Sequence, residues 1–204
     1  MAFNKKFAIN MILYAKKSYE TLTYSKGSDG FLLEIDHEGN QILSFPGSLE
    51  IMDWIQDVDF VKVKRDGMGY LHNGFVDVWD KLKRQVQIRL NKSEPLFIVG
   101  HSLGGAVATI AALALHNKGF KIDAIYTFGS PRVGNSEWKK KFNESGIEYH
   151  RIVNGDDIVT SVPKLFYYHV GNEVRINKRG FFSWTHNKIL DHKIENYLSN
   201  LEKL

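Results

Sequence analysis

The stretch Leu96–Gly105, with the sequence LFIVGHSLGG, joins an apolar run to an alanine-rich run that continues to about Asn117. A short apolar run is typical of a buried strand, and the alanine-rich run is typical of a helix. Between them, Gly100–Gly104 has the pattern GxSxG, which between a strand and a helix forms a nucleophile elbow, a sharp turn that exposes a serine. That serine is Ser102. The pentapeptide alone is weak evidence, because glycine and serine are common, so the rest of the chain has to support the interpretation.

The composition predicts one compact domain over residues 1–204. Hydrophobic residues make up 43% of the chain and charged residues 25%, which excludes the compositions of disordered and fibrous proteins. Cysteine is absent, so disulfides and thiolate metal ligands are excluded and the redox compartment is not revealed. The net charge of +4 favours anionic surfaces, but no basic motif is interleaved with aromatic residues, so we do not expect nucleic-acid binding. Nothing in the sequence indicates an oligomeric state.

The N-terminal segment has some features of a signal peptide. Lys5 and Lys6 precede the apolar stretch Phe7–Ala15, but Asn10 interrupts this stretch and Leu13 stands where a cleavage site needs a small residue. No apolar run approaches the 18 or so residues that would cross a bilayer. We therefore expect no cleaved signal peptide and favour a cytoplasmic location, with export by another route left open. Apolar residues at helical spacing favour a helix instead, namely Ala8, Ile12, Ala15, Tyr19 and Leu22.

Short apolar segments alternate with helical patterns along the chain. Phe31–Ile35 and Gln41–Phe45 surround a turn-rich sequence and predict a β-hairpin. After the elbow, strands are expected at Ala124–Phe128 and Tyr149–Val153, with a helix from about Asn135 between them. This alternation predicts an α/β fold with a mostly parallel central sheet and helices on both faces. Apolar stripes predict two further helices, one with Phe75, Val78, Trp79, Leu82 and Val86, and the other with Ile194, Tyr197, Leu198 and Leu201.

Two segments do not fit the alternation. Phe166–Ile176 is rich in aromatic and β-branched residues and predicts an extended hairpin, in which His169 would be structural. Lys62–Tyr70 contains Gly67 and Gly69, so it is interpreted as a hinge or a simple turn.

A reactive serine needs two partners. An imidazole must take its proton and a carboxylate must orient that imidazole, and after an elbow of this kind the chain order is serine, acid, histidine. Asp156 and Asp157 follow the predicted strand Tyr149–Val153, at the sheet edge where α/β sites assemble. Both are candidates for the acid. An ordinary turn is the alternative, because Asp, Asn and Gly also cluster in turns.

The candidate bases are histidines downstream of these carboxylates. His186 and His192 flank the loop that enters the last predicted helix, and the pattern alone does not decide between them. His101 adjoins the serine, but neighbouring residues on a sharp turn point in different directions. We therefore do not expect His101 to be the base.

Taken together, the motifs resemble the class 3 lipases, the fungal triacylglycerol lipase type of α/β-hydrolase. The resemblance covers most of the chain, from about Phe31 to Leu198. Seven motifs stand in the order that the family has, which is far more specific than GxSxG alone. They are FPGS at 45–48, HNGF at 72–75, VGHSLGGAVA at 99–108, TFGSPRVGN at 127–135, RIVNGDDIV at 151–159, YHVGNEV at 168–174 and DHKIENYL at 191–198.

The resemblance implies a serine hydrolase that cleaves carboxylic esters of lipids through an acyl-enzyme, without metal or cofactor. By matching position it implies that Ser102 is the nucleophile, Asp157 the acid and His192 the base. One oxyanion donor is expected at the backbone amide of Leu103, the residue after the nucleophile. The resemblance implies a second at Ser48, whose side chain could equally cap a helix. Alternatives are a phospholipase A1, a soluble short-chain carboxylesterase and, more remotely, a non-catalytic lipase-like binding or signalling protein.

The sequence departs from the family at Pro46, where an arginine is common. Proline cannot make the polar contacts of that arginine, so the support of the oxyanion loop is expected to differ.

The segment after Ser48 predicts a short amphipathic helix. In the fungal lipases this segment is the lid over the active site, and Trp54 matches the position of the lid tryptophan. A permanently packed helix is the alternative. The expected partners are a lipid or ester substrate and, transiently, an anionic lipid interface. The apolar face of the predicted lid consists of Ile51, Trp54, Ile55 and Val58.

Overall fold

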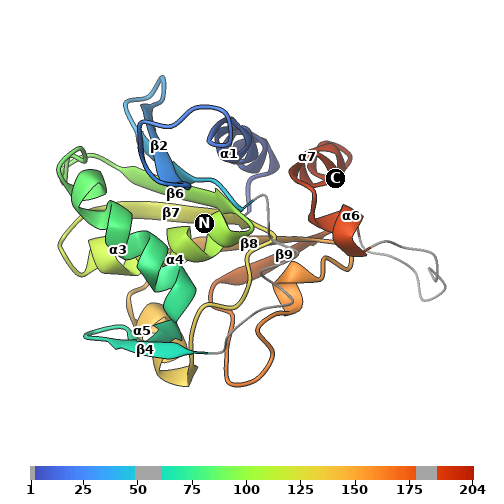
Figure 1. Ribbon diagram of the computed structural model, residues 1–204. Helices are drawn as coiled ribbons and strands as arrows, with labels where there is room; N and C mark the ends of the chain where they lie inside the picture. Colours follow the sequence, from blue (N-terminus) through green and yellow to red (C-terminus); the bar gives the residue numbers. More distant parts are fainter. Residues whose placement is uncertain (1–2, 49–60, 178–187) are drawn as a thin grey trace.

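The computed structural model describes residues 3–48, 61–177 and 188–204 (Figure 1). Within these residues, a seven-stranded sheet has the order β1-β2-β3-β6-β7-β8-β9, and a separate two-stranded sheet pairs β4 with β5. The pairs from β3 to β9 are parallel, and β1, β2 and β3 are joined antiparallel. The expectation of a mostly parallel central sheet is confirmed. The seven strands are β1 (Tyr24–Lys26), β2 (Asp29–Ile35), β3 (Gln41–Phe45), β6 (Leu96–His101), β7 (Ile122–Phe128), β8 (Tyr149–Asn154) and β9 (Asn172–Ile176).

Helices cover both faces of this sheet (Figure 1). On one face lie α3 (Asn73–Gln87), α4 (Leu103–His116) and α5 (Ser136–Glu144), and on the other lie α1 (Lys5–Lys17) and α7 (Ile194–Glu202). Each face has its own apolar core, because a parallel sheet buries both of its faces. The carboxyl ends of the parallel strands and the N-terminus of α4 then meet at one edge of the sheet.

The alanine-rich sequence of α4 follows from its position. The helix packs between the sheet and α3, and 11 of its 14 residues are buried. Small side chains such as Ala108, Ala111 and Ala112 let the helix approach the strands closely on all sides, and each is fully buried. This rigid packing fixes the start of α4, where Ser102 lies.

The prediction of an extended hairpin at Phe166–Ile176 is wrong. Only Asn172–Ile176 forms a strand, and it pairs parallel with β8. Positive φ angles at Phe166 (59°) and Gly171 (77°) turn the chain, so the aromatic residues before β9 lie in a loop. His169 is in this loop, where its Nε2 donates to the Thr160 carbonyl at 2.7 Å, and burial together with the charge of Arg151 lowers its pKa to about 3.

The segment Lys62–Tyr70 is more ordered than the hinge or turn that the sequence predicts. It forms most of an antiparallel hairpin, β4 (Lys62–Arg65) and β5 (Gly69–His72), closed by a turn with Gly67 at φ 71°. The predicted lid residues Ile51, Trp54, Ile55 and Val58 lie outside the described residues. Of the helices that the structure describes, none is long and apolar enough to cross a membrane.

Candidate active site

Ser102 lies at the sharp turn between β6 and α4. Its φ of 58° and ψ of −128° are strained for a residue with a Cβ, at a cost of about 1–3 kcal/mol. The turn persists because the surrounding backbone holds it: the amide of Ser102 donates to the Phe128 carbonyl at 2.9 Å, and its carbonyl accepts from the amide of Gly105 at 2.9 Å. A Cβ at Gly104 would collide with the carbonyl oxygens of Phe45 and Pro46. The glycine is therefore required for the loop after β3 to approach the elbow.

Asp157 and His192 come together at the same edge of the sheet. Asp157 follows β8, and His192 is the last residue of the short helix α6 (Lys188–His192). The Oδ2 of Asp157 lies 2.8 Å from Nδ1 of His192, and both side chains are almost fully buried. Because a carboxylate can only accept, Nδ1 carries the proton in the neutral imidazole, and the lone pair is left on Nε2.

Two further donors fix the carboxylate of Asp157. The backbone amide of Val159 donates to Oδ1 at 2.9 Å, and the hydroxyl of Tyr197 donates to Oδ2 at 2.6 Å. Burial, followed by the charge of Asp157, raises the pKa of Tyr197 well above its ordinary value, so this hydroxyl keeps its proton and stays a donor. Three donors thus hold one carboxylate in a fixed orientation.

The rival acid Asp156 is placed differently. Its backbone amide donates to Oδ2 of Asp191 at 3.0 Å, and its side chain is exposed. Among the described residues, the acid bonded to a histidine at this edge is Asp157. The rival base His186 lies outside the described residues.

Two buried polar atoms of the site are unsatisfied. Oγ of Ser102 and Nε2 of His192 have no hydrogen-bond partner among the described residues. Leaving such groups unpaired costs about 1–3 kcal/mol each, so a buried unsatisfied pair calls for a functional reason. Catalytic hydrogen bonds are often long in the absence of substrate and tighten when it binds.

The expected oxyanion donors lie beside the elbow. Leu103 is the first residue of α4, so its amide has no acceptor within the helix and belongs to the positive end of the helix dipole. Ser48 is half-buried at the end of the loop that follows β3. Both residues line a cavity of about 430 Å³, together with Tyr19, Val78 and Val107. Its lining is mixed, with apolar residues such as Val78 and Val107 and polar residues such as Ser18 and Asp29.

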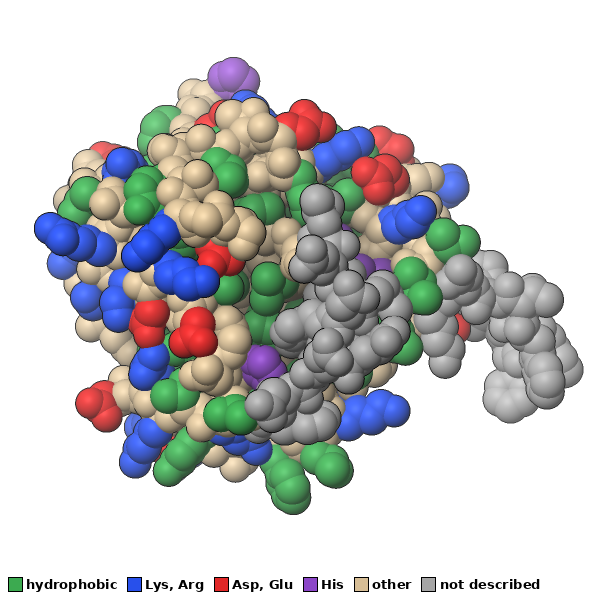
Figure 2. Space-filling model, viewed as in Figure 1, with side chains coloured by type: hydrophobic (Ala, Val, Ile, Leu, Met, Phe, Trp, Pro, Cys, Tyr) green, Lys and Arg blue, Asp and Glu red, His purple; other side chains and the backbone are tan. Residues whose placement is uncertain are grey.

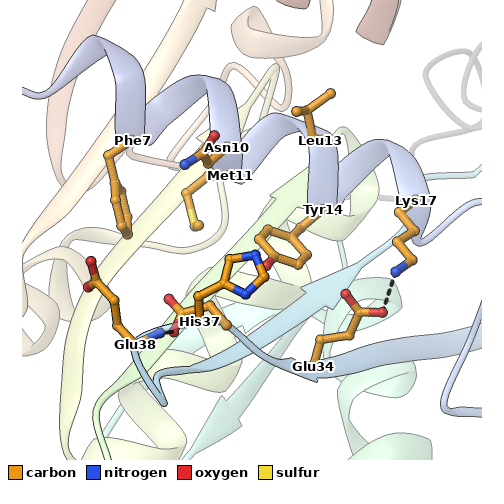
Figure 3. A pocket seen from close by; sticks show the side chains of 10 residues that line it. Phe7, Asn10, Met11, Leu13, Tyr14, Lys17, Glu34, His37 and Glu38 are labelled. Carbon is orange, nitrogen blue, oxygen red and sulfur yellow. Dashed lines mark hydrogen bonds and ion pairs between the residues drawn. The ribbon is translucent and has the colours of Figure 1, made fainter.

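A larger cavity, of about 550 Å³, lies away from this site (Figure 3). It opens between α1 and the turn that joins β2 to β3, with Met11 and Tyr14 on the helix side and the Lys17–Glu34 ion pair at one end. None of the predicted site residues lines it.

His101 connects the elbow with His192, the expected base. Its Nε2 lies 2.8 Å from the backbone oxygen of His192, which can only accept, so Nε2 carries the proton. Its Nδ1 must then accept from the hydroxyl of Tyr19, at 2.6 Å. Burial, and then the nearby His192, lower the pKa of His101 to about 3, so the ring is neutral at physiological pH. The two imidazole rings stack with centroids 4.8 Å apart.

Tyr19 also contacts the loop after β3, which carries the expected oxyanion donor Ser48. A Cβ at Gly47 would collide with the Tyr19 hydroxyl, and the backbone amide of Gly47 faces it. The sequence does not connect Tyr19 and Tyr197 with the site, because both fit apolar stripes of predicted helices. An aromatic residue with a polar tip at the buried end of such a stripe is the signal that could have found them.

No group of three or more His, Asp or Glu side chains in the described ranges is arranged to hold a metal ion.

A serine that lies on a sharp turn between a strand and a helix, at the edge of a mostly parallel sheet, is typical of the α/β-hydrolase fold. The family model described as Lipase (class 3) matches residues 42–167. A solved structure described as "A serine protease triad forms the catalytic centre of a triacylglycerol lipase" superposes with a TM-score of 0.76 at 25% identity, covering 87% of this chain and 82% of that one. The chain belongs to the class 3 lipase family.

Two relatives indicate the range of this family. Secreted mono- and diacylglycerol lipase 1 of Fusarium solani is 36% identical over 136 residues, and the match covers 62% of this chain and 40% of the relative. Phospholipase A1-II 1 of Oryza sativa subsp. indica is 28% identical over 225 residues, covering 89% of this chain and 57% of the relative. The chain spans about half the length of these relatives. The expectation of a cytoplasmic location is contradicted, because relatives that are 36% and 33% identical are named as secreted lipases.

Proposed function

We propose that residues 1–204 form one α/β-hydrolase domain that cleaves carboxylic esters of lipids, as a triacylglycerol lipase does. In this proposal Ser102 is the nucleophile, His192 the base and Asp157 the acid, and the backbone amides of Leu103 and Ser48 bind the oxyanion. The observation that carries it is the hydrogen bond of 2.8 Å between Asp157 and His192, with Nε2 of His192 and Oγ of Ser102 both buried and unsatisfied.

The chemistry follows from these positions. As Oγ of Ser102 bonds to the ester carbon, its proton passes to Nε2 of His192, and the carbonyl electron pair moves onto the oxygen. The oxyanion accepts from the two amides, each worth about 3–4 kcal/mol in favourable cases. When the carbonyl re-forms, the alkoxide leaves and takes the proton from Nε2. Water then attacks the acyl-enzyme by the same route, giving its proton to Nε2, and Ser102 leaves with that proton.

The surroundings of the base suit this cycle. The imidazolium that forms twice per turnover lies next to the Asp157 carboxylate, which the Tyr197 hydroxyl keeps in place. His101 stacks on it as a neutral ring, so it adds no second positive charge. Its hydrogen bond to the backbone of His192 restricts the movement of the base.

For the substrate we propose acylglycerols, presented at an anionic lipid interface. A mono- and diacylglycerol lipase among the relatives supports this class, and the net charge of +4 suits an anionic surface. Phospholipids are the second candidate, supported by the phospholipase A1 relative. In both cases the acyl group would lie along the 430 Å³ cavity next to Leu103.

The proposal is tested with a fluorophosphonate probe and a substrate panel. The wild-type protein should be labelled at Ser102 and should hydrolyse nitrophenyl esters, whereas Ser102→Ala should lose both. Ser130→Ala, a buried serine near the elbow, is the matched control and should keep both. Rates on dispersed triacylglycerol and on phosphatidylcholine then decide the substrate class. Labelling and hydrolysis that persist in Ser102→Ala would overturn the proposal.

A further inference from the structure

Two large apolar side chains protrude side by side from the loop between β8 and β9. Leu165 and Phe166 are each 70% exposed, more than any other large hydrophobic residue among those that the structure describes. Single exposed apolar residues are common, but exposed apolar residues that adjoin further apolar groups mark interaction surfaces. Their exposure therefore indicates a surface that contacts a partner.

The loop is held so that these side chains point outward. Phe166 has a φ of 59°, a left-handed conformation that is an outlier for a bulky residue. The backbone on either side is pinned: the amide of Arg132 donates to the Val162 carbonyl at 2.8 Å, and the amide of Tyr168 donates to the Gly134 carbonyl at 2.7 Å. Strain of this kind persists only where the surroundings impose it, and it gathers at functional sites.

One lysine lies against Phe166, and two others lie against neighbouring tyrosine rings. Lys62 of β4 lies with Nζ 5.2 Å from the ring centroid of Phe166, and Lys139 of α5 lies 5.9 Å from that of Tyr168. Lys64 lies 5.7 Å from the ring of Tyr70, which pairs with it across the β4–β5 hairpin. Figure 2 shows hydrophobic side chains protruding at the lower edge of this face with Lys and Arg beside them. We call the set Lys62, Lys64, Lys139, Leu165, Phe166 and Tyr168 the lysine-aromatic patch.

The patch is connected to the active-site edge by the chain itself. The loop that carries it leaves the end of β8 through Asp157 and the short 3-10 helix Val159–Ser161. It therefore emerges from the carboxyl edge of the sheet, where Ser102 and His192 also lie.

We propose that the lysine-aromatic patch docks the protein on an anionic phospholipid surface. Leu165 and Phe166 would enter the boundary between headgroups and acyl chains while the lysines pair with anionic headgroups. A second copy of the chain fits less well, because a two-fold contact would set the lysines of both copies against each other. Glu137, beside Gly69, offsets only part of this charge. The inference rests on the proposed function for its biological meaning, but the docking itself is separately measurable.

The test measures binding to vesicles of phosphatidylcholine, with and without phosphatidylglycerol, in a Ser102→Ala background that leaves the lipid intact. Leu165→Ser/Phe166→Ser should weaken binding to anionic vesicles at least about tenfold. Lys62→Gln/Lys139→Gln should weaken it about fivefold for each lysine, and high salt should remove this second effect. The matched controls are Ile35→Ser/Ile88→Ser and Lys26→Gln/Lys203→Gln, exposed residues of the same types elsewhere, which should bind as the parent does.

Three outcomes would overturn the proposal. They are equal binding of patch and control variants, equal binding to vesicles with and without phosphatidylglycerol, and a dimer that Leu165→Ser/Phe166→Ser dissociates while vesicle binding is absent. When the patch substitutions are made in the protein that retains Ser102, they should leave the rate of hydrolysis of a dissolved nitrophenyl ester unchanged. A protein that hydrolyses this ester but does not bind anionic vesicles refutes the docking and leaves the proposed ester hydrolysis standing. One that binds them but hydrolyses no ester refutes the proposed ester hydrolysis and leaves the docking standing.

Discussion

Acid should destabilise this fold because two buried histidines are neutral in it. Burial, and after it the nearby His192 or Arg151, lower the pKa of His101 and of His169 to about 3, from an ordinary value of 6.5. Unfolding exposes both rings to water, so their pKa values return toward 6.5. Between these values the unfolded chain binds more protons than the folded one. The stability is therefore fully present above pH 6.5 and is lost as the pH falls toward about 3.

The size of the effect follows from the same values. At about pH 5 an exposed imidazole is about 1.5 pH units below its pKa, and one unit corresponds to about 1.4 kcal/mol, so each histidine removes about 2 kcal/mol. Together they remove about 4 kcal/mol, a large part of the roughly 5–15 kcal/mol that stabilises a typical domain. Glu148 and Glu173, whose pKa values lie below the ordinary 4.5, contribute little in this window.

Urea unfolding at about pH 7 and about pH 5, followed by tryptophan fluorescence, measures the loss. His169→Gln keeps a donor for the Thr160 carbonyl but cannot take up a proton, so it should lose about 2 kcal/mol less than wild type over this range. The exposed His37→Gln is the control and should behave as wild type does. If His169→Gln loses as much stability as wild type, the argument from buried neutral histidines is refuted.

Three further substitutions test the site. Tyr197→Phe removes a donor from the Asp157 carboxylate. We expect the free energy of unfolding to fall by about 1–3 kcal/mol, and kcat to fall about tenfold with KM unchanged. An unchanged kcat would contradict the positioning role of Tyr197. Tyr19→Phe should lower kcat about tenfold because His101 and the oxyanion loop lose a shared contact, whereas Tyr14→Phe on α1 should not. Gly104→Ala should unfold at a temperature at least about 10 °C lower, measured by circular dichroism, because its Cβ has no room beside Phe45.

The sequence predicts those parts of the fold in which local pattern and tertiary position agree. The hairpin formed by Phe31–Ile35 and Gln41–Phe45 and the segment from β6 into α4 have the residues that their burial requires, so periodicity predicts them. The loop around Phe166 has strand-like residues for another reason. Phe166 and Tyr168 lie at the surface beside lysines, whereas Tyr167 is buried. A positive φ at Phe166, which the local pattern does not predict, ends any strand there.

The candidate acid is a part of the site that the local sequence pattern does not predict. Asp156 and Asp157 are the same residue type one position apart, and either could follow β8 into a turn. The backbone turn at Val159 decides between them, because its amide donates to the Asp157 carboxylate and directs it into the protein toward His192. Asp156 is left on the outer side, where its amide binds Asp191. The direction of a side chain at a turn depends on tertiary contacts, so sequence distance alone cannot select the acid.

The two tyrosines of the site show why an apolar stripe can conceal a polar network. A tyrosine buries as much apolar surface as other aromatic residues, so Tyr197 fits the core face of its helix and is fully buried. Its hydroxyl nevertheless needs a partner, and that partner is the Asp157 carboxylate. The hydroxyl of Tyr19, which follows α1, likewise has a partner, because it hydrogen-bonds to His101. Both lie outside the 42–167 match, as does His192, the proposed base. Two terminal helical regions must therefore pack on one sheet face before His192 is held in place. We therefore expect that loosening α1 lowers kcat, because the proposed base His192 then moves relative to Ser102, which β6 and α4 hold in place.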